Sequence, residues 1–106
     1  MQINWSEKSR EDLRKILEYV GANFGGRKGK SVLAEIHSQA EMLKDFPKLG
    51  SPFIKDEESG IAYPSLSSKL NRIVYYIDGK TVNIVTVWQT RRDIGNLKKT
   101  TMQPLM

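Results

Sequence analysis

The segment NRIVYYIDGKTVNIVTVWQ, residues 71–89, decides the fold. Two runs rich in β-branched and aromatic residues flank Asp78-Gly79, a dipeptide that suits a type I′ turn because both central residues take positive φ. The segment therefore predicts two antiparallel strands, at residues 71–77 and 81–88, joined by Asp78-Gly79 as a two-residue turn. The register expected from this turn pairs Ile77 with Lys80, Tyr75 with Val82, Ile73 with Ile84 and Arg72 with Val85.

The register assigns the side chains to two faces, because alternate residues of a strand point to opposite sides of a sheet. The more apolar face, which helices are expected to cover, carries Ile73, Tyr75, Ile77, Val82, Ile84, Thr86 and Trp88. The other face carries Arg72, Val74, Tyr76, Asn83, Val87 and Gln89, followed by Arg91 if the strand continues. A single strand arginine is ordinarily just solvated, but several basic or amide groups converging from adjacent strands indicate a binding surface.

The N-terminal half has helical periodicity. Residues 2–5 predict a short strand, and Ser6 stands where a helix N-cap belongs, with acidic residues in the turns that follow. Apolar residues at helical spacing predict a first helix that ends at Gly25-Gly26 and a second that ends near Pro47 and Gly50, with residues 27–30 as the linker. The apolar stripe of the first helix is Leu13, Ile16, Leu17, Val20 and Phe24, and that of the second is Leu33, Ile36, Ala40 and Leu43, flanked by Val32 and Phe46.

The remaining stretch contains a loop and one more strand. Pro52, Gly60 and the acidic run at residues 56–58 indicate a loop, and residues 61–66 predict a strand. The fold class expected is therefore α+β: a short N-terminal strand, an antiparallel two-helix hairpin, then a three-stranded antiparallel meander that forms one twisted sheet, and a short C-terminal tail. With 106 residues, the chain is expected to form a single domain over residues 1–106.

Composition limits the partners and the cellular location. The net charge of +5 favours acidic partners such as nucleic acid, an anionic membrane or an acidic protein, although many small proteins are simply basic. The chain has no cysteine, and we see neither a signal peptide nor a membrane span, so a cytoplasmic protein is expected. We expect no metal and no cofactor, because the acidic run reads as a solvated loop and the lone His37 as a helix-surface residue.

The order of elements resembles the RelE/ParE superfamily of toxins from type II toxin–antitoxin systems. The residues that carry the resemblance are INWSEKSREDLRKILEYV (3–20), LKDFPKLG (43–50), SGIAYPSLSSKLNRIVYYID (59–78) and VWQTRRD (87–93). The resemblance implies a growth inhibitor that a cognate antitoxin neutralises in a hetero-oligomer. It also implies one of two targets, DNA gyrase or the ribosome with its mRNA. The antitoxin is expected to wrap the toxin, with a helix across the hairpin or a strand at a sheet edge.

The resemblance carries two mechanisms over to particular residues. In the metal-independent endoribonucleases of the superfamily, Arg72 matches the strand arginine, and either Arg91 or Arg92 matches the basic group after the last strand. Tyr76 would assist in catalysis, and Lys69 and Gln89 would join the arginines in binding. This chain departs from the nuclease pattern, with Pro64 where many relatives have arginine, Gln89 where they often have histidine, and no aromatic residue at 96 or 97. These departures favour a ParE-like toxin that inhibits a protein target such as gyrase over an mRNA interferase; a non-toxic antitoxin-binding relic is a third alternative.

Overall fold

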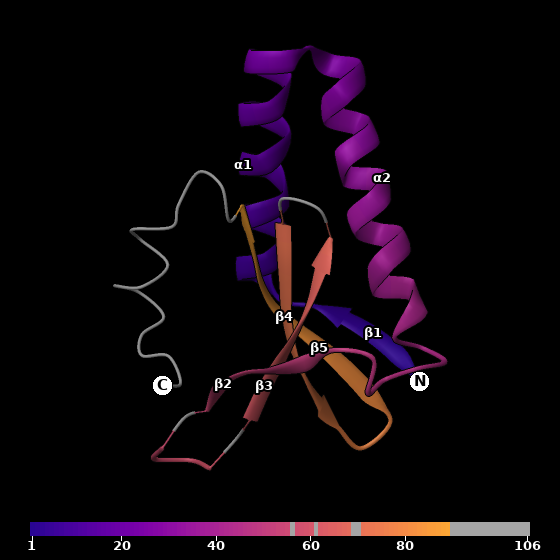
Figure 1. The fold of residues 1–106 in the computed structure, drawn as a ribbon, viewed down its shortest axis with the longest axis vertical. Coiled ribbons are helices and arrows are strands. Elements are labelled where there is room, and N and C mark those ends of the chain that lie inside the picture. The colour runs from indigo at the N-terminus through magenta and orange to yellow at the C-terminus, as the bar shows by residue number, and fades with distance from the viewer. Residues whose placement is uncertain (56, 61, 69–70, 90–106) are drawn as a thin grey trace.

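A computed structural model gives the structure of the chain and describes residues 1–55, 57–60, 62–68 and 71–89. Two helices stand as an antiparallel hairpin beside one mixed sheet (Figure 1). The elements follow the order β1 (Gln2–Trp5), α1 (Glu7–Phe24), α2 (Gly26–Met42), β2 (Ser51–Lys55), β3 (Ala62–Ser68), β4 (Asn71–Asp78) and β5 (Thr81–Gln89). The predicted α+β class is confirmed, but β2 lies where a loop was predicted.

The sheet has the strand order β1-β5-β4-β3-β2. Strand β1 runs parallel to β5, whereas β2, β3, β4 and β5 form an antiparallel meander. Helix α1 packs mainly on β5, and α2 packs on β3 and β4, so both helices cover the same face of the sheet. Strands β1 and β2 are consequently the two outer strands among the described residues.

The helical hairpin turns on a single residue. Ser6 caps α1 as predicted, since its hydroxyl accepts a hydrogen bond from the Ser9 amide at 3.0 Å. Gly25 takes φ 98° and ends α1, and α2 begins at the next residue, so the predicted linker at residues 27–30 is wrong. Gly29 permits the close approach of the two helices, because a Cβ there would stand 3.0 Å from Leu17 Cδ1.

The core lies between the hairpin and the sheet. Two residues of the predicted first stripe are not part of it: Leu17 is only half-buried, and Phe24, at the end of α1, is 65% exposed. Phe46, predicted to flank the second stripe, lies beyond the end of α2 and is 61% exposed. The buried apolar cluster is Leu13, Ile16, Val20, Ile36, Ala40, Leu43, Ile73, Tyr75, Val82, Ile84 and Val87.

Tyr75 fastens the connection between α2 and β2 to the sheet. Its buried hydroxyl donates to the Pro47 carbonyl and accepts from the Gly50 amide, each at 2.9 Å. Burial raises the pKa of the Tyr75 phenol, and the Gly50 N–H opposes part of that rise. Position 50 has no room for a side chain, because a Cβ there would stand 2.6 Å from the Tyr75 oxygen and 2.7 Å from the Ser65 carbonyl oxygen.

The register of β4 and β5 differs from the prediction at the turn. Asp78 pairs with Thr81, so Gly79 and Lys80 form the turn, and Tyr75 pairs with Ile84 rather than Val82. Gly79 supplies the positive φ, at 63°. Because the shift is two residues, the side chains near the turn stay on their predicted faces.

A β-bulge in β5 then exchanges the faces. The register shifts between Val74 and Tyr75, where Val85 is the extra residue of β5. Beyond the bulge Ile73 pairs with Val87, Arg72 with Trp88 and Asn71 with Gln89. Val87 therefore enters the core, and the predicted placement of Trp88 on the helix side and of Gln89 on the other side is wrong. Strict alternation fails here because one inserted residue reverses the parity of everything after it.

Pro64 has a local effect on the sheet. It pairs with Pro52 of β2, and the ladder between β3 and β4 extends only from Ser65 onward. Strand β3 is an inner strand, and the register shift between Pro52 and Ile54 is the local irregularity that accompanies the proline. Two prolines face each other where neither could donate a ladder hydrogen bond.

Candidate functional site

The face of the sheet opposite the helices carries a cluster of aromatic side chains around one arginine. We call it the open-face cluster, and it consists of Phe53, Tyr63, Ser65, Arg72, Tyr76 and Trp88. The residues come from all four antiparallel strands, β2 to β5. The bulge in β5 is essential to it, because the bulge places Trp88 directly opposite Arg72 on this face.

Arg72 is held in place by its neighbours. Its Nη1 donates to the buried hydroxyl of Ser65 at 2.7 Å, and its guanidinium carbon stands 4.7 Å from the centre of the Phe53 ring. Such a cation–π contact is stabilising by about 0.5–1 kcal/mol at partly exposed sites. Arg72 is half-buried, and these two contacts fix its planar fork against the sheet.

The aromatic rings contact one another edge to face. Phe53 meets Trp88 with ring centres 5.7 Å apart, and Tyr63 meets Tyr76 with centres 5.8 Å apart. Val74 lies on this face too, since it pairs with Ser65, yet it is only 2% exposed. The face is therefore a small apolar surface with one fixed cation, not a solvated polar one.

Only part of the predicted site falls on this surface. Arg72 and Tyr76 lie on the open face as predicted, and Gln89 does not, because it pairs with Asn71 on the helix side. Lys69, Arg91 and Arg92 lie outside the described residues. The sequence prediction missed Phe53, because Pro52 before it and the acidic run after it indicated a loop. Apolar runs stand on both sides of residues 56–60, and this pattern could have predicted a β-hairpin that includes Phe53.

Tyr63 and Tyr76 are the only residues of the open-face cluster whose side chains commonly transfer protons. The only histidine of the chain, His37, lies on α2 with its ring 4.9 Å from that of Trp5, on the other side of the sheet. An arginine side chain has only hydrogen-bond donors and cannot act as a general base. In the described part of the chain, no group of three His, Cys, Asp or Glu side chains is placed to hold a metal ion.

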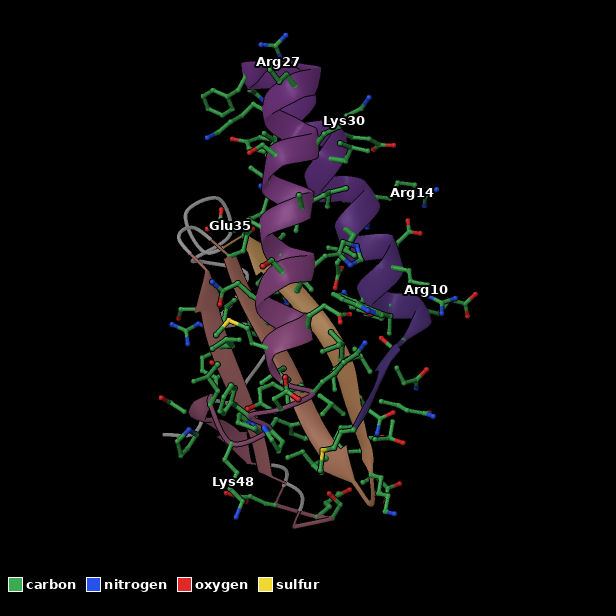
Figure 2. The ribbon with its side chains drawn as sticks, turned by 90° about the vertical axis from the view of Figure 1, so that its right-hand side faces the viewer. Arg10, Arg14, Arg27, Lys30, Glu35 and Lys48 are labelled. Atoms are coloured by element: carbon green, nitrogen blue, oxygen red, sulfur yellow. The ribbon has the colours of Figure 1, made fainter. Side chains whose placement is uncertain are left out.

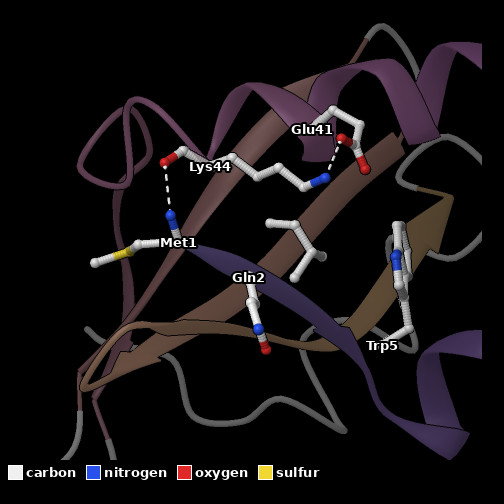
Figure 3. A pocket seen from close by; sticks show the side chains of 6 residues that line it. Met1, Gln2, Trp5, Glu41 and Lys44 are labelled. Carbon is white, nitrogen blue, oxygen red and sulfur yellow. Dashed lines mark hydrogen bonds and ion pairs between the residues drawn. The ribbon is translucent and has the colours of Figure 1, made fainter.

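A second surface feature lies beside the outer strand β1. A groove of about 350 Å³ runs between β1 and the C-terminal end of α2, and Figure 3 shows it closed on one side by the Lys44–Glu41 ion pair, whose length is 2.8 Å. The N-terminal amine of Met1 donates to the Lys44 carbonyl at 3.3 Å. The groove is lined by Met1, Gln2, Ile3, Trp5, Glu41 and Lys44.

The exposed sides of the helices are charged. Figure 2 shows Arg10 and Arg14 pointing away from the sheet on α1, with Arg27 and Lys30 at the far end of the hairpin. Arg14 pairs with Glu11, which lowers the pKa of that exposed carboxyl. Neither helix is long and apolar enough to cross a membrane, as far as the structure describes the chain.

Comparison with known proteins identifies the family. Residues 3–94 match the family model described as the ParE toxin of the parDE type II toxin–antitoxin system. The chain belongs to the ParE toxin family. It is thus the toxin component of a type II toxin–antitoxin system, the class that the sequence resemblance predicted, and its partner is an antitoxin. No curated protein matches the sequence.

Two solved structures share the fold of this ParE-family toxin. One is the chromosomal ParDE system of P. aeruginosa, with a TM-score of 0.68 and 20% identity over 84% of this chain and 95% of that one. The other is the RelBE2 toxin–antitoxin complex of Mycobacterium tuberculosis, with a TM-score of 0.58 and 23% identity over 83% of this chain and 95% of that one. At these identities the likeness shows the fold, and the target has to be argued from the site.

Proposed function

We propose that this ParE-family toxin stops growth by binding a protein target such as DNA gyrase through its open-face cluster, without cleaving RNA. The composition of the cluster carries the proposal. Trp, Tyr and Arg are the residues enriched among the dominant contacts of protein interfaces, and here Trp88, Tyr63, Tyr76 and Arg72 share one face.

The fixed position of Arg72 supports the same conclusion. Ser65 and Phe53 hold the guanidinium before any partner arrives, so little side-chain entropy is lost on binding. The remaining N–H groups can bind a carboxylate of a protein partner. The same groups would suit a phosphate, which is why the nuclease alternative needs its own test.

The open-face cluster has no histidine or carboxylate, and only the phenols of Tyr63 and Tyr76 could transfer protons, which argues against RNA cleavage. Cleavage by the 2′-hydroxyl requires a group that removes its proton and another that protonates the leaving oxygen. The chain's single histidine, His37, is on the helix side, and glutamine at position 89 cannot shuttle a proton. Arg72 supplies charge stabilisation alone, which suits recognition better than catalysis.

The antitoxin is proposed to add an extended segment at the outer edge of β1. None of the described strands lies on that side of β1, and the adjoining groove offers Ile3 and Trp5 to apolar side chains of the added segment. The net charge of +5 favours acidic residues in the same segment. This mode uses the groove and leaves the open-face cluster to the target.

Arginine-to-alanine variants test the target proposal. Arg72→Ala should weaken inhibition of gyrase supercoiling at least tenfold, which corresponds to about 1.4 kcal/mol of binding free energy. Arg10→Ala is the matched control, because Arg10 is exposed on α1 and should leave inhibition unchanged. Wild-type toxin that leaves supercoiling intact would refute gyrase as the target, and equal losses in the two variants would refute the role of the cluster.

A further inference from the structure

The bulge in β5 lies against the beginning of α1, beyond the last residue that β1 pairs with. Strand β1 ends at Trp5, opposite Ile84, so the outer edge of β5 beyond Ile84 needs other hydrogen-bond partners. Ser6 supplies one, because its hydroxyl donates to the Val85 carbonyl at 2.9 Å while it caps α1. The start of α1 thus replaces β1 as the hydrogen-bond partner of β5 beyond Ile84.

Asp12 supplies the other partners. Its Oδ2 accepts from the Val87 amide at 3.1 Å and from the Thr86 hydroxyl, and its Oδ1 accepts from Lys8 Nζ at 2.8 Å. The residue is only 8% exposed. A carboxylate in the second turn of a helix needs no burial to interact with the helix dipole, and burying it is costly unless it is hydrogen-bonded. The burial of Asp12 therefore indicates a specific structural role.

We infer that Asp12 is a positioning residue for the open-face cluster. By holding Thr86 and the Val87 amide it fixes the bulge at Val85, and the bulge directs Val87 into the core and Trp88 to the open face beside Arg72 and Phe53. Without the bulge, alternation would return Trp88 to the helix side and Val87 to the open face. A contact that α1 makes at the outer edge of β5 thereby determines which side chains lie on the open face.

The inference rests on the proposed function only where it assumes that the open-face cluster binds the target. The effect of Asp12 on the position of Trp88 can be tested separately. Trp5→Phe provides the background, since the chain has two tryptophans and Trp88 is then the only one left. The readouts are the NMR contacts between the Trp88 and Phe53 rings and the hydrogen exchange of the Val87 amide. The ring contacts report on the bulge itself and would not respond to a loss of stability that left the bulge in place. The exchange rate, measured under strongly native conditions, reports on the hydrogen bond that Asp12 accepts from the Val87 amide.

Three variants at two positions give distinct expectations. Asp12→Ala should abolish the Trp88–Phe53 ring contacts and speed Val87 exchange at least tenfold. Asp12→Asn should keep the ring contacts, because its amide oxygen can still accept from the two β5 donors. Lys8→Ala is the control, since Lys8 contacts Asp12 but no β5 residue, and it should leave both readouts unchanged.

Retained Trp88–Phe53 ring contacts in a folded Asp12→Ala protein would overturn the inference. If that variant fails to fold, Thr86→Val takes its place, because it removes one of the two β5 donors; lost ring contacts support the inference, and retained contacts overturn it. Gyrase inhibition is measured in parallel. Lost ring contacts in Asp12→Ala, together with a wild type that does not inhibit gyrase, would sustain the positioning role and refute only the proposed target.

Discussion

Replacing Tyr75 by phenylalanine should destabilise the fold through two unpaired backbone groups. The substitution keeps the buried ring but removes the oxygen that binds the Pro47 carbonyl and the Gly50 amide, each at 2.9 Å. An unsatisfied buried group costs about 1–3 kcal/mol, and both backbone groups lie in half-buried residues that water can partly reach. We therefore expect a loss of about 2 kcal/mol in the free energy of unfolding.

Urea unfolding followed by circular dichroism gives the measurement. Tyr76→Phe is the matched control, because Tyr76 lies next in sequence but on the open face, and its change should stay within about 0.5 kcal/mol. A Tyr75→Phe protein as stable as the wild type, or no less stable than Tyr76→Phe, would refute the role assigned to the hydroxyl.

The same variant should change the response to alkaline pH. Burial raises the pKa of Tyr75, so the phenol ionises at lower pH in the unfolded chain than in the folded one. The stability due to this group is therefore fully present below the unfolded pKa of about 10 and is lost as pH rises through the folded pKa. The difference in unfolding free energy between the wild type and Tyr75→Phe should narrow above about pH 10. A difference that stayed constant or widened would contradict the raised pKa.

Three further outcomes are expected. Induced expression of the toxin alone should arrest bacterial growth and co-expression of its antitoxin should restore it, whereas normal growth at confirmed soluble expression would count against toxicity. Gly50→Ala should destabilise the fold by about 1–3 kcal/mol, because its Cβ would stand 2.6 Å from the Tyr75 oxygen. Gly21→Ala, which has open space around it inside α1, should stabilise the fold by about 0.5–1 kcal/mol. Urea unfolding measures both changes, and equal effects would contradict the contact at Gly50. The affinity for the antitoxin, measured by calorimetry, should fall as the salt concentration rises. An affinity independent of salt would exclude binding of acidic antitoxin residues to this toxin of net charge +5.

Local signals in the sequence located the elements that local chemistry determines. The strand at residues 2–5, the Ser6 cap and the helix end at Gly25 are as predicted, because each depends on a residue and its immediate neighbours. Turn chemistry found the β4–β5 hairpin but misplaced its centre by one residue, since Gly79 satisfies the positive φ in either arrangement.

The candidate site depended on contacts that no local signal reveals. Strand alternation placed Arg72 and Tyr76 on the open face, but it put Trp88 and Gln89 on the wrong faces. The bulge that reverses them is held by Ser6 and Asp12, more than 70 residues earlier in the chain. Asp12 read as one of several acids near a helix start, and nothing in its neighbourhood of sequence indicates burial.

Primer extension on messages translated in the presence of the toxin is the most direct test of a protein-binding mechanism. Growth should stop with the wild type while the messages stay full-length, and the messages should also stay full-length with Arg72→Ala, which should inhibit growth less. New 5′ ends that map to the ribosomal A site with the wild type, and disappear with Arg72→Ala, would show that Arg72 serves RNA cleavage and would contradict the proposed function.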